Sequence, residues 1–260
     1  DRTMPDYHKI LYSVEQKIAR VTLNRPDKRN ALDDEIIGEL KDAMGRSARD
    51  PDVRVVVITG AGKDFCSGAD LSALLKIAEA TVMENVEDAR SLGELFISMR
   101  RHPRPIIAAV RGRALAGGCG LATACDLILA AESARFGYPE VNIGFIPAMV
   151  MAILRRSVPE KLAFELITRG EVTDARAAQD LGLVNRVFPD EGFDESVTEY
   201  ASQLAGKSAS AVSLSKGLLY HMDSMSFEAA IEAGVQMNAI TRMTDDCKLG
   251  IERFLKKQAP

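Results

Sequence analysis

Alternating apolar and polar positions near the amino terminus predict a β-hairpin. Residues 9–14 and 18–23 both alternate in this way, and this is the two-residue period of a strand with one buried face. The β-branched run 55–59 and the apolar run 106–110 have the composition of buried strands. The pattern therefore predicts a β-sheet whose later strands are separated by longer segments.

Those longer segments have a helical period. Residues 33–49 carry apolar side chains on one face and an aspartate suited to the start of a helix. A polar helix is expected over 81–101, where two following prolines end it. A glycine-rich turn, a short helix through Ala124 and a strand over 126–130 come next. The repeated order of strand, strand and helix predicts a superhelical α/β core.

The character of the chain changes after residue 190. Helical segments then follow one another over 193–205, 209–222, 226–241 and 245–257. Serines at the turns, such as Ser208 and Ser226, can cap the N–H groups at helix starts. We therefore divide the chain into a core, 1–190, and a helical region, 191–260, that either covers the core or makes subunit contacts.

Composition narrows the class of protein. A chain of 260 residues with 47% hydrophobic residues can bury a large core. It has no run of 18 apolar residues and no basic segment followed by an apolar one at its start, which predicts no membrane partner, no signal peptide and a cytoplasmic location. The net charge of −4 argues against a nucleic-acid partner. The four cysteines form no CxxC pair, so we expect reduced, mostly buried thiols and no metal site.

Two glycine-marked turns are candidates for paired backbone donors. Residues 64–71 and 116–120 each follow an apolar strand and lead toward a helix. Such turns can expose free N–H groups at the positive end of a helix dipole. Taken alone, each is more often a device for tight backbone geometry. Taken together, Ala69 and Gly117 predict an oxyanion hole, in which one donor is worth about 2.7 to 4 kcal/mol of transition-state stabilisation.

Four ordered motifs over nearly the whole chain resemble the crotonase superfamily, the enoyl-CoA hydratases and isomerases. They lie within 23–32, 65–71, 106–120 and 136–140. The resemblance implies an α/β fold with a ββα superhelical, or spiral, core that binds acyl-CoA, and a C-terminal helical region for trimerisation. It also implies a homotrimer or a hexamer built as a dimer of trimers. Coenzyme A enters as part of the thioester substrate, and no separate cofactor is expected.

The resemblance assigns roles to individual residues. Glu140 would be the catalytic acid and base beside the hole formed by Ala69 and Gly117. Such a carboxylate needs a partly apolar pocket that raises its pKa toward the working pH. Lys28, Arg29 and Lys257 would contact the phosphates and adenine end of coenzyme A, with Phe254 and Lys257 reaching a neighbouring subunit's ligand. The other implied substrate contacts are Ala31, Ser67, Gly68, Asp70, Leu71, Gly118, Gly120 and Pro139.

Gly120 departs from the family pattern. The best-known hydratases carry a second glutamate at this position, and two carboxylates can divide the activation of water and the supply of a proton. A single Glu140 suffices to move a double bond from position 3 to position 2 of an enoyl thioester. The segment 144–152 nevertheless looks similar to hydratases for branched glutaconyl-type thioesters. We therefore place a hydratase first, an isomerase second and a noncatalytic acyl-CoA-binding protein third.

Other enzyme classes fit the sequence less well. A serine hydrolase would need a histidine partner, and His8, His102 and His221 lie in no recognisable triad context. The third glycine of a dinucleotide-binding fingerprint beginning at Gly60 would fall on Phe65. The acyl pocket is expected around 71–77, whose composition specifies no chain length.

Overall fold

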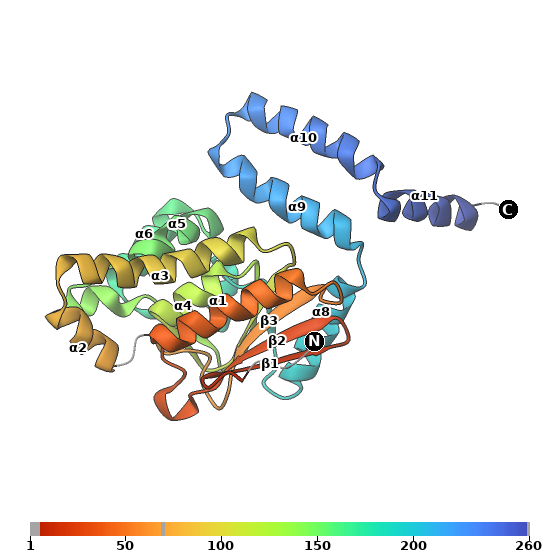
Figure 1. Cartoon of the computed structure of the whole chain (residues 1–260). Coiled ribbons are helices and arrows are strands. Elements are labelled where there is room, and N and C mark those ends of the chain that lie inside the picture. The colour runs from red at the N-terminus through yellow and green to blue at the C-terminus, as the bar shows by residue number, and fades with distance from the viewer. Residues whose placement is uncertain (1–5, 69–70, 259–260) are drawn as a thin grey trace.

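Six strands form the main sheet of the computed structural model, which describes residues 6–68 and 71–258 (Figure 1). Its order is β1-β2-β3-β4-β6-β9. Strands β1 and β2 are antiparallel and every later pair is parallel. The strands are β1 (Ile10–Glu15), β2 (Ile18–Leu23), β3 (Val55–Gly60), β4 (Ile106–Val110), β6 (Leu127–Ala131) and β9 (Arg186–Phe188). The predicted hairpin and the predicted strands up to β6 are confirmed to within one residue at their ends.

A second, three-stranded sheet was not predicted. It pairs β5 (Arg113–Leu115) in parallel with β7 (Arg135–Gly137), and β7 antiparallel with β8 (Val172–Asp174). Each strand has three residues, which is too short for the two-residue hydrophobic period to be visible in the sequence. In this small sheet, β5 leads into the glycine turn at Gly117, and β7 leads into the turn that carries Glu140.

Helices pack around the main sheet. Helix α1 is capped by the side chain of Asp33, which accepts from the Ile36 N–H, and α3 begins with a reciprocal capping box between Thr81 and Glu84. The core helices are α1 (Asp34–Arg49), α2 (Leu71–Glu79), α3 (Val82–Arg101), α4 (Gly117–Ala124), α5 (Ala148–Ser157), α6 (Glu160–Arg169), α7 (Ala175–Asp180) and α8 (Phe193–Ala205). Three short 3-10 turns are η1 (Pro26–Lys28), η2 (Pro139–Ile143) and η3 (Met222–Ser224).

Alternate residues of the buried strands face two different hydrophobic clusters. In β3, Val56 and Ile58 belong to the larger cluster, which includes side chains from α1, α3 and α4. Val55 and Val57 belong to the smaller one, where α8 packs on the sheet. Helix α8 therefore contributes to the core although it follows residue 190. The boundary at residue 190 stays a prediction.

The last three helices form an arm, defined here as α9 (Ala209–His221), α10 (Phe227–Arg242) and α11 (Asp245–Gln258), that projects from the layered core (Figure 1). Ser208 and Ser226 cap α9 and α10 as predicted. Lys216 anchors α9 to the core, because its Nζ donates to Asp126 Oδ2 at 2.7 Å and to the Met99 carbonyl at 3.0 Å. Tyr220 donates to the other oxygen of Asp126 at 2.6 Å.

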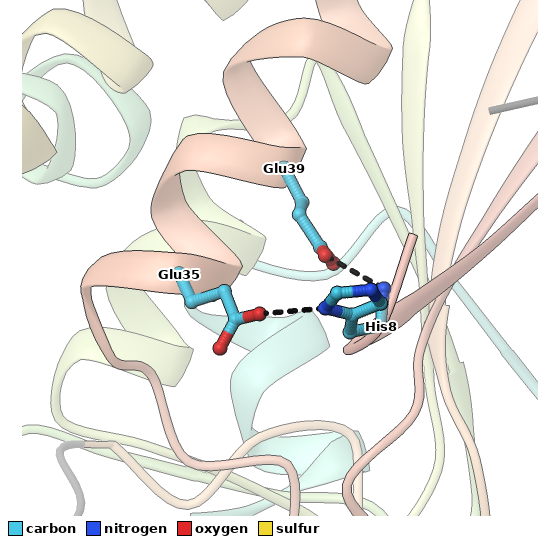
Figure 2. A group of neighbouring side chains, drawn as sticks. All are labelled: His8, Glu35 and Glu39. Carbon is cyan, nitrogen blue, oxygen red and sulfur yellow. Dashed lines mark hydrogen bonds and ion pairs between the residues drawn. The ribbon is translucent and has the colours of Figure 1, made fainter. Parts of the chain in front are cut away.

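Figure 2 shows His8, Glu35 and Glu39, whose ligand-type atoms lie within 4.8 Å of one another. Glu39 accepts the backbone N–H groups of His8 at 2.7 Å, Lys9 at 2.9 Å and Ile10 at 3.0 Å. The Lys9 ammonium lies 2.7 Å from Glu35. These contacts tie the start of β1 to α1, so the cluster serves as a structural clasp.

No helix in the described ranges is both long and apolar enough to cross a bilayer.

Candidate active site

The small sheet brings the two glycine turns together. Cys66 forms a parallel bridge with Ala114, donates its N–H to the Arg113 carbonyl at 2.9 Å, and accepts from the Leu115 N–H at 3.0 Å. Beyond these bonds, a Cβ atom on Gly68 would lie 3.8 Å from the nitrogen of Gly117. The two segments that were predicted to supply the hole are therefore neighbours in space.

Two glycines at this junction are explained by close backbone approach. A Cβ atom on Gly118 would lie 2.2 Å from the carbonyl oxygen of Cys66, a contact that real side chains do not make. Gly68 has a φ of +93° and would place a Cβ 2.9 Å from that of Ala116. Glycine at both positions therefore lets the two turns pack against each other.

Gly117 is the first residue of α4, so its N–H has no partner within the helix. The preceding Ala116 has φ 49° and ψ −126°, and no side chain in the described ranges caps this helix. A non-glycine residue in this conformation is strained, and such strain is held where the surroundings impose it. Here the Ala116 N–H donates to the Gly137 carbonyl at 2.9 Å. Because no acceptor among the described residues takes the Gly117 N–H, it is a candidate donor to a ligand.

Glu140 stands on the 3-10 turn η2, directly after Pro139. Its side chain is about half buried, and its Oε2 is buried without a hydrogen-bond partner among the described residues. Burial raises the pKa of this carboxyl above its ordinary value. A buried, unpaired carboxyl oxygen is costly to keep and is common where a proton must be exchanged.

A buried hydrogen-bond relay connects the turn that carries Glu140 to helix α4. The Thr123 hydroxyl donates its proton to the Cys119 carbonyl at 2.8 Å, so Tyr138 must be the donor in its 2.6 Å contact with Thr123. Tyr138 is fully buried. The same helix therefore begins at the candidate donor Gly117 and, six residues later at Thr123, contacts the segment that carries the candidate acid.

The side of α4 at Gly120 is filled by apolar side chains. A Cβ atom on Gly120 would meet Val150 Cγ2 at 3.4 Å and Phe96 Cζ at 3.5 Å. Both side chains are buried. The position of the absent second carboxylate is thus bordered by apolar side chains.

Asn30 belongs to the first motif, but the sequence analysis assigned it no role. It is fully buried in the left-handed region with φ 54°. Its amide accepts from the Arg25 N–H at 2.9 Å and donates to the carbonyls of Ala61 at 2.9 Å and Asp64 at 2.7 Å. It therefore joins the loop after β2 to the loop that leads into Gly68. The sequence signal that could have indicated this role is the presence of an asparagine at this position of the loop motif 23–32.

The loop after β2 lies against the first turn. Ser67 donates its N–H to the Arg29 carbonyl at 3.0 Å, and the Leu32 N–H donates to the Gly68 carbonyl at 2.7 Å. The predicted coenzyme A contacts Lys28 and Arg29 are exposed beside this junction, whereas Ala31 is buried. The structure thus brings Lys28, Arg29, Ala31, Ser67, Gly68, Gly117 and Gly118 to one region.

Some predicted site residues are not placed beside Glu140. Ala69 and Asp70 lie outside the described residues, as do the side chains of Leu71 and Lys257. Phe254 lies on α11 at the far end of the arm, apart from α4, and is exposed (Figure 1). Within one chain, therefore, the arm does not reach the candidate site.

The cysteines near the site are free thiols. Cys66 and Cys119 are fully buried, and burial raises their pKa values to about 12 and about 11. Their thiolates are scarce at neutral pH, and the thiolate is the nucleophilic form. Cys125 is also buried and Cys247 is partly exposed, so the expectation of mostly buried thiols is confirmed.

Comparisons with known proteins agree with this geometry. A family model described as enoyl-CoA hydratase/isomerase matches residues 13–260. A Thermus thermophilus protein provisionally named an enoyl-CoA hydratase is 42% identical, over 94% of this chain and 96% of its own. The 2,3-dehydroadipyl-CoA hydratase of Escherichia coli is 35% identical, over 96% and 97%. The structure of an enoyl-CoA hydratase from Mycobacterium smegmatis superposes with a TM-score of 0.92 at 33% identity, covering 97% of this chain and 98% of that one.

Proposed function

The chain belongs to the enoyl-CoA hydratase/isomerase family, and we propose that it adds water to a 2-enoyl-CoA thioester. The observation that carries the proposal is the meeting of the Gly68 and Gly117 turns at the start of α4, together with the Thr123–Tyr138 hydrogen bond that joins α4 to the segment of Glu140. Glu140 is a half-buried carboxyl with a raised pKa. The relatives named as hydratases support water addition over other reactions of the family.

Water addition by one carboxylate can proceed on a single face of the substrate. Glu140 takes a proton from water while the water oxygen bonds to C3 of the enoyl group. The electrons of the C2–C3 double bond move to the thioester oxygen, where N–H donors of Ala69 and Gly117 stabilise the enolate. Glu140 then returns the proton to C2. Each backbone donor of this kind is worth about 2.7 to 4 kcal/mol at the transition state.

Double-bond isomerisation is the second candidate, and Gly120 is the observation that favours it. Phe96 and Val150 occupy the side of α4 where a second carboxylate would hold water. Without water, Glu140 would remove a proton from C2 of a 3-enoyl thioester and deliver it to C4. The same enolate and the same oxyanion hole serve both reactions.

The proposal also covers the coenzyme A contacts, the cofactor requirement and the oligomeric state. Coenzyme A would enter with the substrate, its phosphates contacted by Lys28 and Arg29, and no separate cofactor is needed for either proton transfer. The active unit would be a homotrimer or a hexamer, in which Phe254 and Lys257 of one copy reach the ligand of another. A cytoplasmic location stays a prediction.

One assay separates the candidates. Purified protein is incubated with a panel of 2-enoyl-CoA and 3-enoyl-CoA thioesters, and both hydration and double-bond migration are followed. Hydration of a 2-enoyl-CoA that greatly exceeds migration supports the hydratase. Dominant migration would replace it with the isomerase, and saturable binding without turnover of any thioester would leave a noncatalytic acyl-CoA-binding protein.

A further inference from the structure

Phe96 lies between the candidate site and a separate cavity. On one side, its ring tip is 3.5 Å from the position of a Cβ on Gly120. On the other, it lines a cavity of 320 Å³. Phe96 is only 6% exposed and is packed in the main hydrophobic cluster. One buried side chain therefore lies between Gly120 and this cavity, which opens to solvent beside the exposed residues Arg156 and Leu219.

Helix α4 runs between the two places. Gly117 at its start carries the candidate donor, Gly120 lies one turn later, and Thr123 and Ala124 at its end line the cavity. At a rise of about 1.5 Å per residue, the cavity begins roughly 10 Å beyond the donor. An acyl chain that follows α4 from the hole would reach Phe96 first and the cavity next.

The cavity has both polar and apolar walls, and its apolar part can contact an alkyl chain. Ile128, Ile153, Leu183 and Leu219 contribute apolar surface. Charged groups in its lining already have partners, because Asp223 pairs with both Arg100 and Arg156, and Asp126 pairs with Lys216. Four helices, α3, α4, α5 and α9, also end here, and their carbonyl ends disfavour an anion. A volume of this size is at the lower end of the range for ligand pockets, about 300 to 1,000 Å³.

We propose that Phe96 is the residue that ends the acyl pocket, and that the cavity behind it is unused space for a longer acyl chain. The wild-type protein then acts on short-chain enoyl-CoA thioesters. This inference rests on the proposed function for its substrate class. Removal of the Phe96 ring would join the candidate site to the cavity.

Val150 offers a matched control. It contacts the same Cβ position on Gly120, it is as deeply buried as Phe96 at 5% exposed, and it does not line the cavity. Truncating Val150 therefore removes packing at the same glycine without opening the cavity. Any change that follows from loss of packing alone appears in both variants.

The test compares wild type, Phe96→Ala and Val150→Ala with crotonyl-CoA and with 2-decenoyl-CoA. Because each methylene that becomes buried is worth about fourfold in binding, we expect the ratio of kcat/KM for the long over the short substrate to rise about tenfold or more in Phe96→Ala. In Val150→Ala the ratio stays within about twofold of wild type. Wild type itself prefers crotonyl-CoA.

Binding keeps the inference testable apart from turnover. Calorimetric Kd values for butyryl-CoA and decanoyl-CoA measure the preference for long over short acyl chains without turnover. If no thioester reacts, the proposed function fails, but these Kd values still test the role of Phe96. If Phe96→Ala does not fold, Phe96→Leu opens part of the passage and should give a smaller shift in the same direction. The inference is overturned if wild type prefers long chains as strongly as Phe96→Ala does, or if Val150→Ala shows the same shift as Phe96→Ala.

Discussion

Helices α8 and α10 differ in what covers their apolar faces. Helix α8 buries Phe193 and Val197 against the main sheet. Helix α10 leaves Phe227 77%, Ile231 56% and Val235 58% exposed, and none of its residues, all of which the structure describes, is buried. The sheet therefore covers the apolar face of α8 within one chain, whereas α10 presents an apolar face of the kind that marks an interaction site.

This difference suggests that chemistry and assembly can be changed separately. The candidate acid Glu140, the candidate donor Gly117 and the loop that carries Lys28 and Arg29 all lie in the core. The arm is fastened to the core at α9 through Lys216 and Tyr220, and its later helices pack mainly on one another. Changes in the core should alter turnover with assembly retained, and changes on α10 should alter assembly first.

The largest effect is expected from Glu140→Gln. The amide keeps the volume of the side chain but cannot accept a proton at neutral pH, so kcat should fall about a thousandfold for hydration and for isomerisation. Acyl-CoA binding and sedimentation should stay as in wild type. Glu199→Gln, an exposed change on α8, is the control. Undiminished turnover in Glu140→Gln would remove the mechanism.

Gly117→Pro should have the second largest effect and reduce kcat about a hundredfold or more. Proline is tolerated at the first position of a helix and deletes the N–H that would bind the thioester oxygen. Gly117→Ala retains that N–H, and its Cβ would lie 3.5 Å from Leu32, an ordinary contact. Steady-state kinetics should therefore separate the two variants. Equal activity in folded Gly117→Pro and Gly117→Ala contradicts the oxyanion hole.

On the arm, the double change Ile231→Glu and Val235→Glu should dissociate the assembly. Burying one such side chain stabilises an interface by about 1.5 to 3 kcal/mol, and a buried unpaired carboxylate adds a penalty. Analytical ultracentrifugation should then show monomers with an intact circular dichroism spectrum. Glu232→Gln, on the same helix, should leave the mass unchanged. A wild-type monomer with full activity would show that the arm is not needed for assembly.

Asn30→Ala should lower the free energy of unfolding by about 2 to 3 kcal/mol, because it removes the hydrogen bonds of the buried Asn30 amide to the Arg25 N–H and to the carbonyls of Ala61 and Asp64. Alanine is also disfavoured at the φ of 54° found here. Chemical denaturation measures the loss, and Asn142→Ala, at an exposed site, is the control. A change below about 0.5 kcal/mol would show that the hydrogen bonds of Asn30 contribute little to stability.

The smallest effect concerns pH. Burial raises the folded-state pKa of Glu140, so the folded protein binds a proton more tightly than the unfolded chain. Stability is therefore lost as the pH rises from the ordinary glutamate range through the folded pKa. Glu140→Gln should raise Tm relative to wild type at pH 7 and lose this advantage near pH 4. A Tm difference independent of pH would indicate that the Glu140 carboxylate is not desolvated.

Most elements of the core and arm could be predicted from the sequence because their signals are local. The alternation in β1 and β2, the helical period of α1, and the serines that cap α9 and α10 all lie within a few neighbouring residues. The Glu140 and Gly117 assignments came from resemblance of short motifs. The small sheet escaped prediction because three-residue strands depend on partners distant in the chain.

The sequence by itself determined the order of the elements up to β4, the helices from α8 onward, the family and the candidate carboxylate Glu140. Tertiary structure alone decided what surrounds them. It placed Gly68 beside Gly117, filled the side of Gly120 with Phe96 and Val150, and put a cavity behind Phe96. It also covered α8 and left α10 exposed. Local patterns specify which faces are apolar, but packing between distant segments decides which of them meet.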